Sequence, residues 1–225
     1  MYEAEFGRYL RSLTASWQGL AANKTGASVT VQPDYVAARF PDPYVYLNNA
    51  VILAPDAVAA AVAMFSDRPH ALWCLDDATD IAAAIAAHGY AHSETTRPML
   101  RQLHDVPEPE QRTIIEADLD RFADLIDVPP QLLHDVPRLR AYATAGYESG
   151  LVLQDDDHDV YVSMVHTQPH ARRRGLATAV LTAALADARR WGARTATLQS
   201  TPMADHLYLQ HGFTPLGQWQ EWTRQ

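Results

Sequence analysis

Apolar positions at the start of the chain recur with a helical period. Between residues 2 and 20 the large apolar side chains include Tyr2, Phe6, Tyr9, Leu10, Leu13 and Trp17. Steps of three and four residues place them on one face of a helix. The pattern therefore predicts an amphipathic helix over 2–20.

Shorter segments follow, and they alternate between two kinds. β-rich stretches are separated by turn-forming prolines and Asp42, and alanine-rich stretches are typical of helices. Gly89 supplies a left-handed cap after the second of these helices. We expect strands at 28–32, 35–40 and 44–53, a helix at 56–66, a strand at 71–75, a helix at 78–88 and a strand at about 91–103.

Residues 104–112 are polar, contain two prolines and have no period, which indicates a linker. It would separate a domain at 1–107 from a domain at 112–225. For the second domain we expect a strand at 113–116, helices at 118–126 and 129–135, strands at 138–145, 149–154 and 159–167, a helix at 175–191, a strand at 194–200, a helix at 203–211 and a strand at 214–223.

The two halves share short sequences. Residues 87–90 (AHGY) align with 210–213 (QHGF) at an offset of 123, which is 211 minus 88. The same offset lays strand 71–76 on 194–199. Further upstream, 45–47 resembles 160–162 at an offset of 115, which is 160 minus 45. This indicates a duplicated fold whose first copy lacks about 8 residues before its helix. Two unrelated segments of similar composition would explain the same matches.

Charge and composition exclude several classes of protein. The net charge of −9 argues against nucleic acid as a partner, because phosphate backbones are bound by Lys and Arg. No apolar run is long enough for a membrane span, and the acidic N-terminus does not resemble a signal peptide. The single cysteine, Cys74, suits a reducing compartment. We expect a cytoplasmic protein, monomeric or homodimeric.

The strongest chemical signal is a basic turn that opens directly into the helix at 175–191. The turn reads Arg172, Arg173, Arg174, Gly175, Leu176, Ala177 and Thr178. The first turn of a helix has backbone N–H groups without internal partners and a partial positive charge, which suit phosphate oxygens. Small residues at 175 and 177 allow a bulky diphosphate to approach.

This turn resembles the signature of the GNAT superfamily of N-acetyltransferases, Gln/Arg-x-x-Gly-x-Gly/Ala, through Arg172, Gly175 and Ala177. The order of expected elements over 113–225 is also similar to that family. A second match, from Ala204 through Tyr208 to Gly212-Phe213, resembles its Ala-x-x-x-Tyr-x-x-x-Gly-Phe segment. The resemblance implies an α/β (α+β) fold with a mixed, largely antiparallel sheet flanked by helices, and tandem GNAT-like copies if the first half is a degenerate one.

The same resemblance assigns roles to residues. The cofactor would be acetyl-CoA, with its pyrophosphate at 172–178, its pantetheine arm and acetyl group along Val165, His166 and Thr167, and a weaker contact at Thr201. The Val165 amide would face the thioester carbonyl. Tyr208 would protonate the departing thiolate, as the reference pKa of about 10 allows. The alternative for Tyr208 is a core aromatic on an amphipathic helix.

One family feature is missing. Many relatives carry a glutamate as general base four residues before the oxyanion amide, and this position is Tyr161. Ser163, His166, His158 and Glu148 are substitutes, as is a water relay or an amine that arrives neutral. The acidic turn 155–159 contains ligand types for a metal, but adjacent acidic residues in a tight hairpin do not converge on one ion, so no metal site is expected.

The sequence thus predicts an acetyl-CoA-dependent N-acetyltransferase acting on a small-molecule or peptide amine by direct attack. A non-catalytic acyl-CoA sensor or scaffold is the alternative, and a packing or dimerisation module without a ligand is a third reading. The acceptor is not readable from the sequence.

Overall fold

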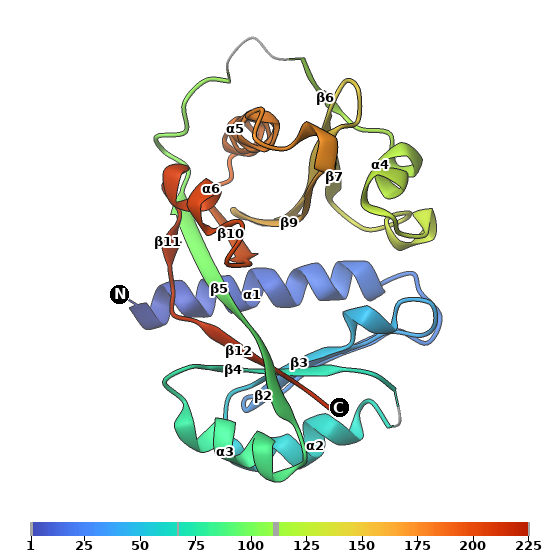
Figure 1. Ribbon diagram of the computed structural model, residues 1–225, viewed down its shortest axis with the longest axis vertical. Helices are drawn as coiled ribbons and strands as arrows, with labels where there is room; N and C mark the ends of the chain where they lie inside the picture. The colour runs from blue at the N-terminus through green and yellow to red at the C-terminus, as the bar shows by residue number, and fades with distance from the viewer. Residues whose placement is uncertain (1, 67, 110–112, 225) are drawn as a thin grey trace.

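The computed structural model describes residues 2–66, 68–109 and 113–224. Its first element, α1 (Tyr2–Ala21), confirms the predicted amphipathic helix. Tyr9, Leu13 and Trp17 of the predicted apolar face are buried. The helix lies between the strands of the first half and those of the second (Figure 1), and it contacts strands of both. Its apolar face therefore joins the two halves.

The rest of the first half follows the predicted order of strands and helices. Its elements are β1 (Ser28–Val31), β2 (Tyr35–Arg39), the 3-10 turn η1 (Val45–Leu47), β3 (Asn49–Ile52), the 3-10 turn η2 (Pro55–Ala57), α2 (Val58–Ala63), β4 (Ala71–Leu75), α3 (Thr79–Ala87) and β5 (Ala91–Gln102). The predicted linker lies partly outside the described residues, which resume at 113.

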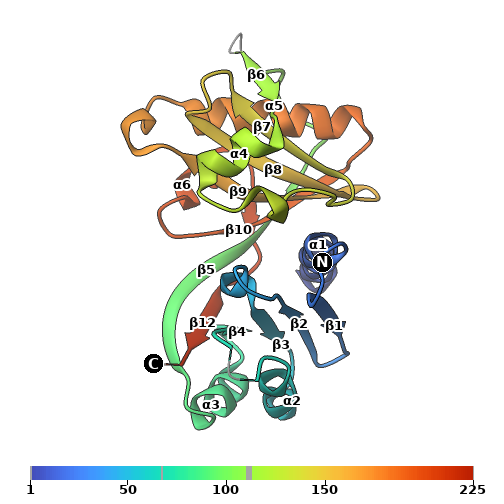
Figure 2. The same cartoon turned by 90° about the vertical axis from the view of Figure 1, so that its right-hand side faces the viewer.

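The second half also keeps the predicted order. Its elements are β6 (Ile114–Glu116), α4 (Leu119–Ile126), the 3-10 turn η3 (Pro130–Leu132), β7 (Leu139–Thr144), β8 (Ser149–Asp156), β9 (Asp159–Thr167), the 3-10 turn η4 (Pro169–Ala171), α5 (Leu176–Arg190), β10 (Thr195–Ser200), α6 (Asp205–Gln210), β11 (Thr214–Pro215) and β12 (Trp219–Thr223). In Figure 2, α5 lies across the strands of this half and α4 lies in front of them.

The strands form one mixed sheet, which confirms that part of the expected fold. Its order is β1-β2-β3-β4-β12-β5-β10-β9-β8-β7-β6, with β11 beside β5. The pairs β3–β4 and β9–β10 are parallel, and the other described pairs are antiparallel. Two antiparallel pairs precede the parallel pair in the first half, and three precede it in the second.

The two halves exchange strands at the centre of the sheet. The first part of β5 pairs with β12, up to Thr96 opposite Trp219. The second part, from Arg97 to Gln102, pairs with β10, and it also pairs with β11. In turn, β12 from the end of the chain lies between β4 and β5 of the first half. The strands of the second half are therefore completed by a strand of the first.

Trp219 anchors this exchange. It is fully buried on β12, and its ring centroid lies 5.5 Å from that of Phe6 and 6.4 Å from that of Trp73. Its indole N–H donates to the Tyr9 hydroxyl at 3.1 Å. Trp219 of β12 thus packs against both α1 and β4.

Three sequence predictions fail in detail. The strand at 214–223 is split into β11 and β12, with Gly217 in a left-handed conformation (φ 98°) between them. The helix at 129–135 is only the turn η3, which begins at Pro130, and Asp135 has a left-handed φ of 58° where the predicted helix would have continued. The strand at 44–53 begins at Asn49, since 45–47 forms η1.

The last of these failures corrects the repeat alignment. At the offset of 123, Leu72 corresponds to Thr195. Leu72 pairs with Ala50 in the sheet, and Thr195 pairs with Asp159. If the first half is a copy of the second, the equivalent of Asp159 is Ala50, an offset of 109 (159 − 50), and not the offset of 115 that resulted from matching 45–47 with 160–162. The first half is shorter at this point by 14 residues (123 − 109), which is enough to remove the whole basic turn.

Candidate functional site

The parallel strands β9 and β10 separate beyond their midpoints. The last pair of residues between them is Val162 and Leu198, although β9 continues to Thr167 and β10 to Ser200. The pairing of β9 with β8 also contains a bulge, because Met164 and Val165 of β9 lie opposite the single residue Leu151 of β8. Met164 has a left-handed φ of 52°. This bulge re-aims the strand, as bulges beside functional sites commonly do. An open wedge results.

The basic turn closes one side of this wedge. Gly175 is the N-cap of α5 and has a φ of 73°, which glycine adopts without steric cost. The helix begins at Leu176, so the N–H groups of its first turn have no acceptor within the helix. The Arg172 Nε donates to the Thr167 carbonyl at 3.2 Å, which ties the turn to the end of β9.

A cleft of about 440 Å³ lies between this turn, β9 and α6. Ten of the predicted site residues line it: Val165, His166, Thr167, Arg172, Arg173, Gly175, Leu176, Ala177, Thr178 and Tyr208. Met203, His206, Leu207 and Gln210 line the opposite wall. Residues that are up to 45 positions apart in the sequence (210 − 165) therefore share one cavity.

Arg174 and Thr201 do not line the cleft. The Arg174 Nη1 donates to Glu148 Oε1 at 2.8 Å, and the His170 Nε2 lies 3.7 Å from the same oxygen. Glu148, on the turn between β7 and β8, thus holds the basic turn from outside. The sequence did not indicate this role. Thr201 is exposed, and its carbonyl accepts a hydrogen bond from Ser200, whose hydroxyl also contacts Asp205 at 2.7 Å.

Tyr208 lies on α6 at the inner end of the cleft. Only 4% of the residue is exposed, and its ring centroid is 5.8 Å from that of Phe213 in an edge-on arrangement. Burial raises the pKa of the Tyr208 phenol well above its ordinary value. The group therefore stays protonated at neutral pH. This environment accommodates both the predicted acid and a core aromatic.

The candidates for a general base lie in different places. Tyr161 is buried under α1, and burial raises its pKa, with a smaller contribution from Tyr208. Glu148 is engaged by Arg174. His158 lies in the turn between β8 and β9, at the end of β9 remote from the cleft. His166 lines the cleft, and Ser163 is half-buried just before the bulge.

Within 2–66, 68–109 and 113–224, no group of three or more His, Cys, Asp or Glu side chains is arranged to hold a metal ion. In the same residues, no helix combines the length and apolar character needed to cross a bilayer.

The chain matches the family model described as the acetyltransferase (GNAT) family over residues 97–213, just over half of its length. The chain belongs to the GNAT acetyltransferase family. The match to GNAT begins at Arg97, where β5 stops pairing with β12 and starts pairing with β10. The matched segment thus includes the second part of β5, which belongs to the first half of the chain and pairs with β10 of the second half.

Solved structures with the same fold cover nearly the whole chain. A GCN5-related N-acetyltransferase from Kribbella flavida aligns with a TM-score of 0.70 and 20% identity, over 95% of this chain and 94% of that one. One from Sphaerobacter thermophilus aligns at 0.62 and 14%, over 95% and 90%. A tandem GNAT protein from the clavulanic acid biosynthesis pathway aligns at 0.57 and 15%, over 93% and 86%. No curated protein sequence matched.

Proposed function

We propose that the protein is an acetyl-CoA-dependent N-acetyltransferase that transfers an acetyl group to the amine of a small molecule or peptide by direct attack. The observation that carries this proposal is the cleft at the wedge between β9 and β10, which the helix start at Gly175 closes on one side. Membership of the GNAT family supports acetyl-CoA as the donor.

The residues of the cleft suit the parts of this donor. The first-turn N–H groups of α5, from Leu176 to Thr178, would bind the pyrophosphate, with charge added by Arg172 and Arg173. The separated end of β9, from Val165 to Thr167, presents backbone groups to the pantetheine arm. Gly175, Ala177 and Thr178, which line the cleft at this point, have small side chains or none, which leaves room for a bulky anion.

In the chemical step, the amine nitrogen bonds to the thioester carbonyl carbon and the carbon–sulfur bond breaks. The Val165 amide would stabilise the negative charge that develops on the carbonyl oxygen, an effect worth about 3–4 kcal/mol for one such donor. Tyr208 would give its proton to the departing thiolate, and the amine would lose its own proton to solvent or to a nearby base. The raised pKa of Tyr208 supports the acid role.

The binding assignment is tested by Gly175→Asp. An added carboxylate at the helix start would repel the diphosphate, so calorimetry should detect no acetyl-CoA binding. Gly192→Asp is the matched control, since Gly192 also has a left-handed φ of 98°, at the opposite end of α5, with open space around it. Affinity retained by Gly175→Asp would remove the turn from the binding site.

The acid role is tested by Tyr208→Phe. We expect kcat to fall by about 10²-fold or more, while acetyl-CoA affinity changes little. Tyr35→Phe, which alters another buried tyrosine on β2, is the control. The assay follows release of free thiol from acetyl-CoA with a panel of amines. An unchanged kcat in Tyr208→Phe would reduce Tyr208 to a packing role.

The same assay separates this function from the alternative, a non-catalytic acyl-CoA sensor or scaffold. A sensor would bind acetyl-CoA but release no thiol with any amine. The feature that favours the alternative is the buried Tyr161, which stands where many relatives carry the glutamate base.

We infer that residues 1–107 are a degenerate GNAT-like copy and 112–225 the active copy. The support is the shared pairing pattern of β1–β4 and β7–β10, in which two antiparallel pairs precede a parallel one. The similarity in fold to a tandem GNAT protein agrees with it. Loss of 14 residues (123 − 109) explains why the first copy has no basic turn.

A further inference from the structure

Gln199 lies at the point where β10 separates from β9. Since the last pair between these strands is Val162 and Leu198, Gln199 is the residue at which β10 leaves β9. On its other side β10 stays paired with β5, where Gln199 lies opposite Pro98. The end of β10 is therefore one wall of the wedge, and a strand of the first half supports it.

The Gln199 amide bonds to two elements of the first half. Its Nε2 donates to Thr96 Oγ1 on β5 at 2.7 Å, and its Oε1 accepts from the Tyr9 hydroxyl on α1 at 3.2 Å. The Tyr9 hydroxyl in turn accepts from the Trp219 indole N–H at 3.1 Å, which leaves its own proton for Gln199. The four side chains thus form one directed chain of hydrogen bonds, from β12 through α1 to β10 and β5.

Most of this hydrogen-bonded chain is withdrawn from water. Tyr9 and Trp219 are fully buried, Thr96 is 5% exposed, and Gln199 is half-buried. Burial raises the pKa of the Tyr9 phenol well above its ordinary value, so the hydroxyl keeps the proton that it donates. A buried polar group that loses its partner is costly, so the loss of one member favours movement of the others.

The same bonds span the place where β5 changes its partner. Thr96 lies opposite Trp219 of β12. The next residue of β5, Arg97, lies opposite Ser200 of β10. The strands β12 and β10 therefore pair with successive parts of β5, and the Tyr9 hydroxyl joins a side chain of each. Contacts with the first half thus fix the end of β10 on the side away from β9.

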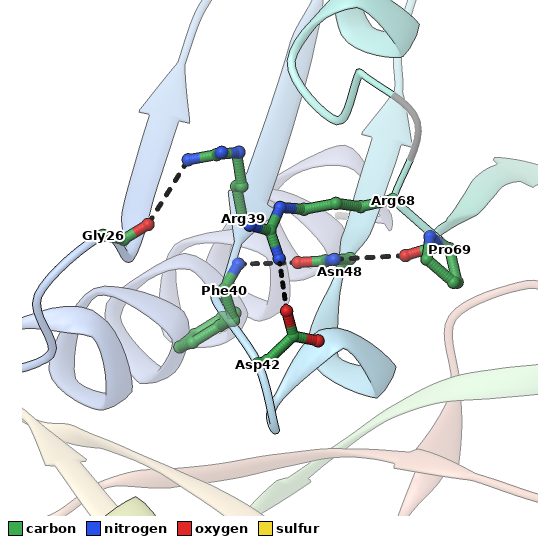
Figure 3. A network of polar contacts seen from close by, with 7 residues as sticks. All are labelled: Gly26, Arg39, Phe40, Asp42, Asn48, Arg68 and Pro69. Atoms are coloured by element: carbon green, nitrogen blue, oxygen red, sulfur yellow. Dashed lines mark hydrogen bonds and ion pairs between the residues drawn. The ribbon is translucent and has the colours of Figure 1, made fainter.

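A buried amide in the first half bonds in the opposite sense (Figure 3). Asn48, just before β3, accepts from the Phe40 N–H at 2.6 Å and donates to the Pro69 carbonyl, in the loop before β4, at 3.1 Å. This side chain joins the beginnings of the parallel strands β3 and β4. Both bonds of the Gln199 amide go instead to α1 and β5, so they hold β10 without drawing it toward β9.

We propose that Gln199 is a positioning residue for the donor: held by Tyr9 and Thr96, it keeps the end of β10 apart from β9, so that the wedge admits the pantetheine arm and thioester of acetyl-CoA. This inference rests on the proposed function. It gives the first half a part in donor binding, although the basic turn belongs to the second half. The first half acts through the strand that forms the wall.

The test measures acetyl-CoA affinity by calorimetry in the full chain, with the thermal midpoint of each variant as evidence that it is folded. Thr96→Val keeps the shape of the side chain but removes the hydroxyl that accepts from Gln199, whereas Thr96→Ser keeps a hydroxyl. We expect Gln199→Leu and Thr96→Val each to weaken acetyl-CoA binding by about fivefold or more. Thr96→Ser should bind as the unaltered protein does.

Gln154→Leu is the matched control. Gln154 is a buried glutamine of β8 whose Nε2 donates to the Ala15 carbonyl of α1 at 3.5 Å, so it also joins the two halves. It lies opposite Tyr161, in the part of β9 that is still paired with β10. Its replacement should change the thermal midpoint but not the affinity.

The proposal is overturned if Gln199→Leu and Thr96→Val bind acetyl-CoA as tightly as the unaltered protein. It is also overturned if Thr96→Ser or Gln154→Leu weakens binding as much as they do, because the effect would then be one of general stability. If Gln199→Leu does not fold, the comparison of Thr96→Val with Thr96→Ser decides. Failure of the unaltered protein to bind acetyl-CoA would instead contradict the proposed function, and this inference with it.

Discussion

At the scale of single residues, close packing decides which positions tolerate change. Gly150 on β8 lies beneath α4, and a Cβ added there would come within 2.7 Å of both Phe122 Cε2 and the Tyr142 carbonyl oxygen. A backbone oxygen cannot move aside as a side chain can. The glycine is thus required by the close approach of α4 and of the neighbouring strand β7, and not by its backbone angles.

We therefore expect Gly150→Ala to lower the free energy of unfolding by roughly 1–3 kcal/mol. The measurement is urea denaturation followed by fluorescence. Gly7→Ala is the control, because a Cβ on this α1 residue meets nothing nearer than the Arg11 guanidinium at 3.8 Å. That change should be neutral or slightly stabilising, since alanine favours a helix. Equal stability of the two variants would contradict the packing argument.

Cys74 provides a second prediction at this scale. Its side chain is fully buried on β4, and burial raises the pKa of the thiol to about 11. Near pH 8 very little thiolate is present, and the reagent cannot reach it. Iodoacetamide should leave the native protein unmodified by mass spectrometry over a time in which the urea-unfolded chain reacts fully. Rapid modification of the native protein would show that β4 opens readily.

At the scale of elements, the central strands depend on each other through Trp219. Trp219→Ala removes a fully buried side chain and its hydrogen bond to Tyr9, and it leaves a cavity between α1 and β4. The expected loss is about 3–5 kcal/mol. Because β12 contributes to the first half and is continuous with the second, thermal unfolding should remain a single transition at a lower midpoint. Two separated transitions would contradict this coupling.

The order of elements was predictable, but the pairing of strands that are distant in the sequence was not. The period at 2–20 and the basic turn at 172–178 are local signals, and both identified their elements correctly. The strand at 91–103 was also predicted, but nothing in its residues indicates that one end pairs with β12 and the other with β10. The break between β11 and β12 had a local signal in Gly217, but the prediction of one continuous strand over 214–223 did not use it.

The candidate site shows the same division. The residues that bring a helix start and a strand end together follow one another in the sequence, so their grouping could be predicted. The direction of an arginine side chain could not. Arg172 points to the Thr167 carbonyl and Arg174 to Glu148, although both belong to one basic run. The direction of Arg174 depends on Glu148, which lies in a turn 26 residues away (174 − 148).

At the scale of the whole molecule, the exchange of strands makes separate folding of the halves unfavourable. A fragment of 112–225 lacks β5, so β10 and β11 lose the strand that lies between them, and unpaired edges tend to aggregate. We expect this fragment to be insoluble or unfolded when it is produced alone. Co-expression with 1–107 should restore a soluble complex, as measured by size-exclusion chromatography. A stable, monomeric 112–225 would contradict the prediction.

The position of β12 has a consequence for how the protein is made. A ribosome delivers β1 to β5 first, yet the gap between β4 and β5 is filled only by residues 219–223. Until residues 219–223 have been synthesised, the first half has two open strand edges, and Trp73 lacks its contact with Trp219. During translation the first half therefore depends on α1 or on a chaperone to keep that gap from joining a neighbouring nascent chain.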